Sequence, residues 1–259
     1  MEIVVLGIIQ GLTEWFPVSS TGHLKVAEYF LGEHISLLFD FTLHLGTLIV
    51  TLLFFRKDIA GIFRALVHLD FTTEHGRLIP LIVVGTIPAG IIGVLLYEPV
   101  NLIFQDILPA AIGFLLCGVI LFSVRYSHES TDTISYSAAA IIGIAEGIAV
   151  IPGVSRSGVT IAVALLLGIK RGKAFKFSFL LSIPAVIGAL GYSSLQRFSD
   201  FAFLGLSWPE VVIGIATTTV VGYFALKLFW RIIDYKKFHL FALYCWLIGA
   251  SLLLFSLYR

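Results

Sequence analysis

The sequence predicts an all-α integral membrane protein with about six transmembrane helices and two re-entrant helical hairpins, arranged as an inverted-topology repeat. The first observation is composition: of 259 residues, 58% are hydrophobic and only 13% are charged, whereas soluble domains are close to half apolar. The second is a set of uncharged runs long enough to cross a bilayer. The third is a pair of polar motifs set in apolar sequence. We expect one membrane domain over residues 1–259.

Six apolar segments have about the length that a helix needs to cross the hydrocarbon. They are Leu78–Tyr97, Ile107–Val124, Phe177–Gln196, Val211–Leu226, Leu240–Tyr258 and Phe41–Phe55. The last contains His44, which is expected to face the bundle interior, where packing and function are equally plausible. Cys117 and Cys245 also lie in these spans and are expected to be small packing residues. The chain is therefore expected to be a multi-pass integral membrane protein.

The basic residues indicate the orientation of the spans, because Lys and Arg gather in cytoplasmic loops. Most of the 17 basic residues fall in loops that we assign to the inside: Arg56, Lys57, Arg64, Arg77, Arg125, Lys170, Arg171, Lys173, Lys176, Lys227, Arg231, Lys236 and Lys237. The outside then holds Lys25, Arg197 and Arg259, while Arg156 belongs to a motif. Both termini are expected outside.

The two halves of the chain, roughly residues 1–130 and 131–259, repeat each other. Residues 10–23 match 146–160 in their order of a polar side chain, a proline and a Ser/Gly turn. Residues 39–45 match residues 175–181, with the same spacing that separates residue 10 from residue 146. Because the charge distribution starts the two matched spans on opposite sides, the repeat is expected to be inverted, an arrangement that recurs in transporters.

Neither motif region is long enough to cross the membrane as an ordinary helix. Residues 3–9 are followed by polar side chains, and Val159–Ile169 covers only about half a bilayer at 1.5 Å per residue. Each region is therefore expected to be a re-entrant hairpin. Irregular backbone at membrane depth is tolerated only where it is buried in protein or lines a wet cavity. The two turns are thus expected to face one polar chamber near mid-membrane.

The turns themselves are predicted from prolines and glycines. An internal proline removes a helical hydrogen bond and clashes with the preceding turn, so Pro17 and Pro152 are expected to end the first arm of each hairpin. Gly22, Gly153 and Gly158 are expected to permit the tight turns.

The first motif carries reactive groups. Gln10 and Glu14 are four residues apart and so lie on one helix face. Ser20 and His23 are three apart, close enough on a helix for the imidazole to take the hydroxyl proton of a serine nucleophile. His23 could equally position a water molecule, and capping by Ser20 with a packed His23 is a structural alternative.

The second motif has the groups of an anion site. Residues 153–160 offer a glycine-flanked run of backbone N–H groups that opens a helix, together with hydroxyls and Arg156. Helix N-termini concentrate unpaired donors, and a guanidinium binds phosphate oxygens in a fork. A charged residue at this depth is costly and indicates function.

A carboxylate beside an anion site requires an explanation, because Glu14 should repel phosphate. A divalent cation, Mg²⁺ or Ca²⁺, held by Glu14 and Gln10 together with substrate oxygens, would bridge carboxylate and diphosphate. The alternative is that Glu14 is protonated, or paired with Arg156 to hold the hairpins together, since buried carboxylates are generally neutralised or paired.

Over nearly its full length the chain resembles the undecaprenyl-diphosphate phosphatases, also called bacitracin-resistance proteins. Residues 10–23, QGLTEWFPVSSTGH, resemble the family's (Glu/Gln)-x-x-x-Glu motif followed by Pro-x-Ser-Ser-x-Gly-His, and residues 152–160, PGVSRSGVT, resemble its second signature. The resemblance implies hydrolysis of undecaprenyl diphosphate to undecaprenyl phosphate and inorganic phosphate, which recycles the lipid carrier of cell-wall peptidoglycan synthesis. It also implies dependence on a divalent metal, and bacitracin resistance on overproduction.

Carried over position by position, the residues that match those the family uses for activity are Glu14, Ser20, His23, Ser155, Arg156 and Thr160. With the reasoning from the residues, we expect catalysis by Glu14, Ser20, His23 and Arg156. We expect phosphate binding by Ser19, Ser155, Arg156, Ser157 and Thr160, and metal binding by Glu14 and Gln10. Gln10 stands where many members have Glu, which leaves one charged ligand fewer.

An alternative function is a flippase or transporter of polyprenyl phosphate that uses the same chamber, because inverted repeats with broken helices suit alternating access. The asymmetry between the halves favours hydrolysis: Glu14, Ser20 and His23 correspond to Val150, Arg156 and Val159. The expected partner is a membrane-embedded polyprenyl diphosphate. No nucleic acid is expected, and a homodimer is left open.

Overall fold

The computed structural model describes residues 2–31, 37–103, 106–196, 208–235 and 237–258, which form helices and no β-strand. Five of these helices are long and apolar enough to cross a membrane: α5 (Glu74–Ile103), α6 (Ile107–Ser123), α9 (Arg171–Gln196), α10 (Trp208–Ile233) and α11 (Phe241–Leu257). They contain five of the six predicted spans. The sixth lies in α3 (Leu37–Phe54), whose described apolar part is shorter. The prediction of an all-α integral membrane protein is confirmed.

Short helices make up most of the rest. The first hairpin consists of α1 (Glu2–Thr13) and α2 (Ser20–Leu31), and the second of α7 (Tyr136–Ile148) and α8 (Arg156–Leu166). The helix α4 (Arg56–Val67) precedes α5, and two single-turn helices, η1 (Val124–Tyr126) and η3 (Phe238–Leu240), follow α6 and precede α11. The two polar motifs of the sequence thus lie in two helix–turn–helix segments.

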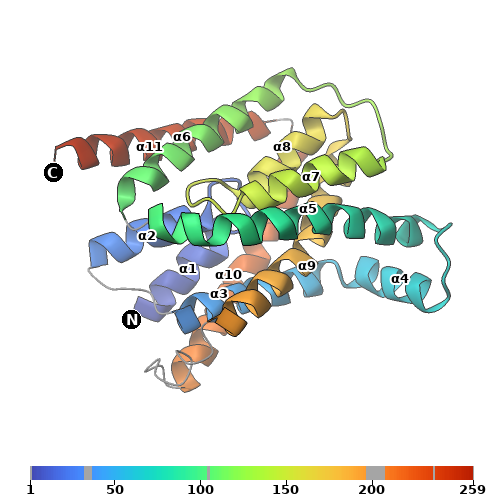
Figure 1. Cartoon of the computed structure of the whole chain (residues 1–259), viewed down its shortest axis with the longest axis horizontal. Helices are drawn as coiled ribbons and strands as arrows, with labels where there is room; N and C mark the ends of the chain where they lie inside the picture. Colours follow the sequence, from blue (N-terminus) through green and yellow to red (C-terminus); the bar gives the residue numbers. More distant parts are fainter. Residues whose placement is uncertain (1, 32–36, 104–105, 197–207, 236, 259) are drawn as a thin grey trace.

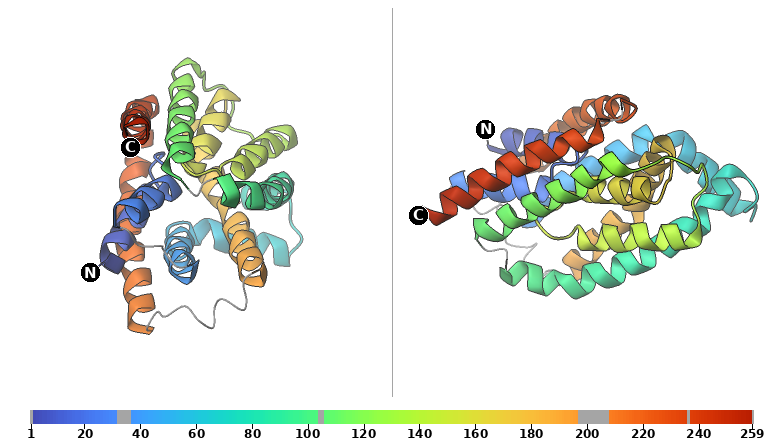
Figure 2. Two further views of the ribbon diagram at one scale, coloured as in Figure 1. Left: turned by 60° about the vertical axis from the view of Figure 1, so that its left-hand side comes forward. Right: turned by 90° about the horizontal axis from the view of Figure 1, so that it is seen from above.

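The packing of the helices has the symmetry of a repeat. The first hairpin packs through α1 against α10, and the second packs through α7 against α5. In the same way α3 packs against α10, and α9 against α5. Each half therefore supplies the long helix that covers the hairpin of the other half, and α6 and α11 pair with each other, as the views in Figure 2 show.

Glycines at the repeat offset allow these close contacts. A Cβ added to Gly143 on α7 would lie 2.0 Å from the carbonyl oxygen of Gly85 on α5. The corresponding contact in the other half is at Gly7 on α1, where an added Cβ would lie 3.1 Å from Thr217 on α10. Small residues at such positions let helix backbones approach closely, which is how helices associate in membranes.

Charged side chains gather at one end of the molecule. The start of α9 is tied to α4 by an ion pair of 2.7 Å between Lys176 and Asp58, and to the start of α5 by one of 2.5 Å between Lys173 and Glu74. Figure 1 shows α4 and the connection between α6 and α7 at the right-hand end, with both termini at the left. Helix α1 runs inward from the left and α7 from the right, as an inverted repeat requires. Arg197, Lys236 and Arg259 of the charge assignment lie outside the described residues.

Candidate active site

Each hairpin breaks four residues before its proline. Helix α1 ends at Thr13 and α7 at Ile148, while the prolines are Pro17 and Pro152. A proline ring clashes with the carbonyl four residues earlier, which favours a helix end at these positions, although α5 continues through Pro80, Pro88 and Pro99. The prediction that the prolines end the first arms is confirmed, and the irregular turns cover residues 14–19 and 149–155.

The second arm of each hairpin begins with the same serine cap. Ser19 accepts a hydrogen bond from the backbone N–H of Gly22 at 3.2 Å, and Ser155 accepts one from Gly158 at 3.1 Å. The two serines are related by the repeat offset and satisfy unpaired donors of the first helical turn. Ser19 adopts a φ of 65°, which is unusual for a residue with a side chain.

The two turns meet in a symmetrical pair of contacts. A Cβ on Gly22 would lie 3.0 Å from Cα of Gly153, and a Cβ on Gly158 would lie 3.0 Å from Cβ of Pro17. The repeat offset relates Gly22 to Gly158 and Pro17 to Gly153, so the two contacts are equivalent. The prediction that all three glycines serve the turns is therefore wrong for Gly22 and Gly158, which lie in helices and allow the hairpins to touch. Only Gly153, with a φ of 89°, needs glycine for the turn.

Polar side chains hold the two turns together. Ser19 accepts a second hydrogen bond, from the N–H of Gly153 at 3.1 Å, and Ser157 donates to the carbonyl of Trp15 at 3.2 Å. Thr160 donates to the carbonyl of Arg156 at 2.8 Å and shares a 2.5 Å hydrogen bond with Ser178 on α9. The oxygens of these three buried hydroxyls are thus already engaged with the protein.

The thiols of α6 and α11 brace the same turns. Cys117 on α6 accepts from the N–H of Ser155 at 3.4 Å, and Cys245 on α11 donates to the carbonyl of Pro17 at 3.6 Å. Both cysteines are buried and not in a disulfide. Their interpretation as packing residues agrees with these contacts.

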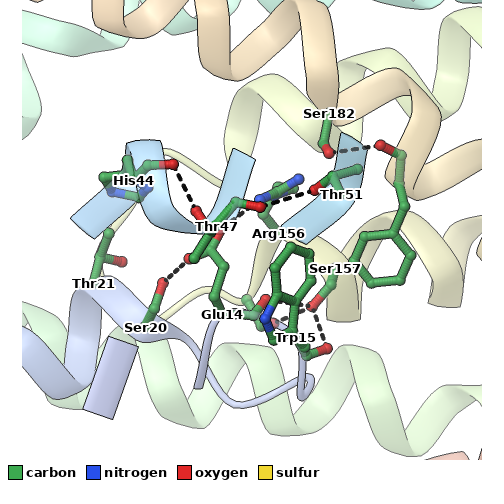
Figure 3. Close-up of polar contacts among 12 residues, drawn as sticks. Glu14, Trp15, Ser20, Thr21, His44, Thr47, Thr51, Arg156, Ser157 and Ser182 are labelled. Atoms are coloured by element: carbon green, nitrogen blue, oxygen red, sulfur yellow. Dashed lines mark hydrogen bonds and ion pairs between the residues drawn. The ribbon is translucent and has the colours of Figure 1, made fainter. Parts of the chain in front are cut away.

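Glu14 is the centre of the polar cluster (Figure 3). One carboxylate oxygen accepts an ion-paired hydrogen bond from Arg156 of the second hairpin. The other accepts from Ser20 at 2.5 Å and from Gln10 at 3.1 Å. The pairing of Glu14 with Arg156, which the sequence left as an alternative to a cation bridge, is present and links the hairpins.

A cavity of about 560 Å³ opens beside this cluster. Its polar wall comes from both hairpins and from α3: Glu14, Ser20, Thr21, His44, Glu146, Ser155 and Arg156. Its apolar wall comes from α5 and α9 and consists mainly of small residues, among them Ala89, Gly90, Gly93, Ala185, Gly188 and Ala189. Tyr97 of α5 and Tyr192 of α9 also line it and touch each other, with ring centroids 5.2 Å apart. The cavity is polar at one end and apolar along a slot between two long helices.

The cavity divides the predicted site residues into two groups. Those that line it are Glu14, Ser20, Ser155 and Arg156. Those that do not are Gln10, Ser19, His23, Ser157 and Thr160. Direct contact of the second group with a phosphate or a metal stays a prediction, and their present contacts give them the role of fixing the hairpins.

The predicted pairing of Ser20 with His23 is wrong. The Ser20 hydroxyl donates to Glu14, whereas the imidazole of His23 uses Nδ1 toward the carbonyl of Ser19 at 2.7 Å and Nε2 toward the hydroxyl of Tyr244 at 2.7 Å. Residues three apart share a helix face, and Ser20 and His23 both lie on α2. However, the turn before α2 folds Glu14 back toward Ser20, and the hydroxyl donates to that carboxylate at 2.5 Å. The group placed to take a proton from Ser20 is therefore Glu14.

Comparison with known proteins agrees with this architecture. Residues 3–251 match the profile of the family described as "Bacitracin resistance protein BacA". The chain belongs to this family. The match covers both hairpins and all the long helices except the end of α11.

Three curated relatives of this chain carry the same name. A protein of Desulfosudis oleivorans is 42% identical over 263 residues, covering 95% of both chains, and is named "Undecaprenyl-diphosphatase". A protein of Methanosphaera stadtmanae with the same name is 37% identical over 99% of this chain and 98% of its own. Another from Halothermothrix orenii is 37% identical over 98% and 97%. The resemblance stated from the motifs is confirmed.

Three residues at this BacA site had no assigned role in the sequence. Glu146 lines the cavity opposite Glu14, His44 lines it from α3, and Tyr244 of α11 holds His23. The repeat pairs Glu146 with Gln10, and His44 is expected to face the bundle interior, but neither residue has a chemical role predicted from the sequence. Tyr244 gave no local signal, because only the fold brings α11 to the first hairpin.

The donor set at the cavity suits a hard divalent cation only in part. Glu14, Glu146 and the hydroxyls of Ser20 and Ser155 are oxygen donors of the kind that Mg²⁺ and Ca²⁺ prefer. Among the described residues, however, no three His, Cys, Asp or Glu side chains gather as a ready metal centre. A cation would therefore complete its coordination with oxygens of a bound diphosphate. Gln10, which is 0% exposed, does not reach the cavity wall.

Proposed function

We propose that the protein hydrolyses undecaprenyl diphosphate to undecaprenyl phosphate and inorganic phosphate. Membership of the BacA family and the shared name of relatives that align end to end support this activity. The carrier alternative draws no support from either. The reaction recycles the lipid carrier of cell-wall synthesis and accounts for bacitracin resistance on overproduction. The location proposed with it is the cell (inner) membrane.

The single observation that carries the proposal is the two-ended cavity. A polyprenyl diphosphate is a strongly anionic head on a long apolar chain. The polar end of the cavity offers Arg156, Ser155 and the N-terminus of α8, which suit phosphate oxygens. The slot between α5 and α9 offers small side chains, and glycines that face open space, so that an apolar chain can lie along it.

The arrangement around Ser20 suggests a chemical step. In the covalent route, the Ser20 oxygen attacks the terminal phosphorus, its proton passes to Glu14, and the bond to the bridging oxygen breaks so that undecaprenyl phosphate leaves. Water then hydrolyses the phosphoserine and releases inorganic phosphate. In the alternative route, a water held by Ser20 and Glu14 attacks directly and gives up its proton to Glu14. In both, Arg156 stabilises the negative charge that develops on phosphorus.

A divalent cation, Mg²⁺ or Ca²⁺, is part of the proposal. When bound, it would neutralise charge on the diphosphate and make phosphorus a better electrophile. On the protein side, Glu14 faces the cavity with oxygen atoms suited to such an ion.

The test is release of inorganic phosphate from undecaprenyl diphosphate by the purified protein in detergent. The unmodified protein should release phosphate, and EDTA should abolish the release. Arg156→Ala and Glu14→Ala should each lower the rate by about 10²-fold or more, because each removes a charge that the transition state needs. Ser182→Ala is the control, since this buried serine on α9 donates to the backbone carbonyl of Phe179 and is not among the described residues that line the cavity.

The slot is tested with the same assay and two substrates. Gly188 has no atom within 4 Å of an added Cβ and lines the slot, so Gly188→Leu should fold and should fill the space. The rate with the full-length lipid should then fall more than the rate with a short prenyl diphosphate. An equal fall in rate with both substrates would mean that the prenyl chain binds outside the slot. Absence of hydrolysis by the unmodified protein would contradict the activity itself.

A further inference from the structure

Glu146 is a buried carboxylate to which neither the motif reasoning nor the proposed chemistry gives a role. Its side chain lines the cavity, yet the residue is only 7% exposed. Its Oε2 has no hydrogen-bond partner within the part of the chain that the structure describes, and its Oε1 lies 4.0 Å from Nη1 of Arg156. A buried carboxylate oxygen without a hydrogen bond is costly, so a ligand that supplies the missing interaction to Oε2 is favoured.

The charges at the cavity do not balance. Among the described residues that line it, two are acidic, Glu14 and Glu146, and Arg156 is the permanent cation. Arg156 donates through Nη2 to Glu14, while its Nη1 is buried without a hydrogen-bond partner in this part of the chain. One guanidinium therefore neutralises one carboxylate well and the other poorly. A diphosphate would add further negative charge, and the cavity then needs positive charge from outside the protein.

The position of Glu146 follows from the repeat. It stands on α7 at the offset that relates it to Gln10 on α1. Gln10 is completely buried, donates to Glu14 at 3.1 Å and does not line the cavity, whereas Glu146 does. The half of the molecule that carries the anion site thus also carries the second carboxylate, and the half with Glu14 carries the amide.

We propose that Glu146, and not Gln10, is the second carboxylate-type ligand that holds a divalent cation together with Glu14. Glu14 and Glu146, one from each hairpin, would supply carboxylate oxygens to Mg²⁺ or Ca²⁺, and phosphate oxygens would supply further ligands. Arg156, which lies between the two carboxylates in this structure, would then be released to bind phosphate. The inference deepens the proposed function and relies on it only for the identity of the diphosphate.

The experiment measures cation binding without the lipid substrate. The purified protein is stripped with EDTA, and its thermal unfolding midpoint is followed during titration with Mg²⁺ and with Ca²⁺, in the absence and presence of inorganic pyrophosphate. A ligand that binds only the folded state raises the midpoint in a concentration-dependent way. The variants are Glu146→Gln, which keeps the shape, Glu146→Asp, which keeps the charge, and Gln10→Met. Glu2→Gln, an exposed carboxylate at the start of α1, is the matched control.

Glu146→Gln should raise the cation concentration for half-maximal stabilisation by about tenfold or more. Glu146→Asp should have a smaller effect, and Glu2→Gln should shift it by less than about twofold. Gln10→Met removes a hydrogen bond to Glu14 but no ligand, so it should shift the concentration less than Glu146→Gln does. An unchanged cation requirement in Glu146→Gln would overturn the proposal and leave Glu146 as an anchor of Arg156. Absence of stabilisation of the unmodified protein under both conditions, or a shift in Gln10→Met as large as that in Glu146→Gln, would also overturn it.

A parallel phosphate-release assay separates this inference from the proposed function. If the unmodified protein binds the cation through Glu146 but releases no phosphate from undecaprenyl diphosphate, the activity is wrong and the metal site stands. If it releases phosphate while Glu146→Gln keeps the cation requirement of both measurements, the activity stands and the metal site is wrong.

Discussion

At the scale of single residues, the site is built around one carboxylate. Glu14 receives hydrogen bonds from Ser20 and Gln10 of its own hairpin and an ion pair from Arg156 of the other. Removing one partner of such a buried pair typically costs about 3–5 kcal/mol, because the remaining charge has no replacement. Glu14 therefore serves stability and chemistry together, and variants at this position need a folding control as well as an activity measurement.

Ser20→Ala tests the covalent route. If the serine oxygen attacks phosphorus, its removal should lower phosphate release by about 10²-fold or more, because Ser20 supplies the hydroxyl that is hydrogen-bonded to the Glu14 carboxylate. The folded fraction should stay close to that of the unmodified protein, as judged by gel filtration in detergent. Full activity in this variant would exclude the covalent route and leave attack by water.

At the scale of helices, contact between the halves depends on residues without side chains. Helix α7 lies against α5 so closely that Gly143 and the backbone at Gly85 leave no room for a methyl group, and α1 is held against α10 at corresponding positions. Helices in lipid gain little from hydrophobic burial against each other, so close backbone packing supplies much of their association. The hairpins can be short because a long helix of the other half covers each of them.

Gly143→Ala should therefore prevent correct packing of the second hairpin. The added Cβ would lie 2.0 Å from a backbone oxygen, which cannot rotate away. Overpacking of this kind costs at least about 1–3 kcal/mol, so the yield of folded protein in detergent should drop. Gly191→Ala on α9, where an added Cβ meets no atom within 4 Å, should leave the yield unchanged. Equal yields of the two variants would contradict the packing described for α5 and α7.

At the scale of the whole molecule, an inverted repeat brings two unlike hairpins together. The backbone features repeat: the proline breaks, the serine caps at Ser19 and Ser155, and the glycine contacts. The chemical groups do not repeat. At the repeat offset, Glu14, Ser20 and His23 correspond to Val150, Arg156 and Val159. The fold thus uses symmetry to place two turns in contact and asymmetry to make one of them reactive and the other anion-binding.

The distribution of basic residues predicts which end of the molecule lies on the cytoplasmic side of the membrane. Lys25 on α2 and Lys173 on α9 are both partly exposed, and Cys117 and Cys245 are buried. In intact cells, a membrane-impermeant maleimide should therefore label Lys25→Cys, and should label Lys173→Cys only after permeabilisation. The unmodified protein should give no signal. The reverse pattern would invert the orientation, and labelling of both in intact cells would contradict opposite ends.

The membrane class, the spans, the repeat and four cavity residues, Glu14, Ser20, Ser155 and Arg156, were predictable from the chain. Apolar length, charge distribution and helix-breaking prolines are local properties, and so they are visible in the sequence. The partner of each polar group follows instead from the folded arrangement of the helices. In the folded protein, Ser20 donates to Glu14 and His23 contacts Tyr244. The hydroxyls of Ser19, Ser157 and Thr160 bond to backbone groups, and Glu146 lines the cavity. These choices depend on contacts between elements far apart in sequence, and no local pattern specifies them.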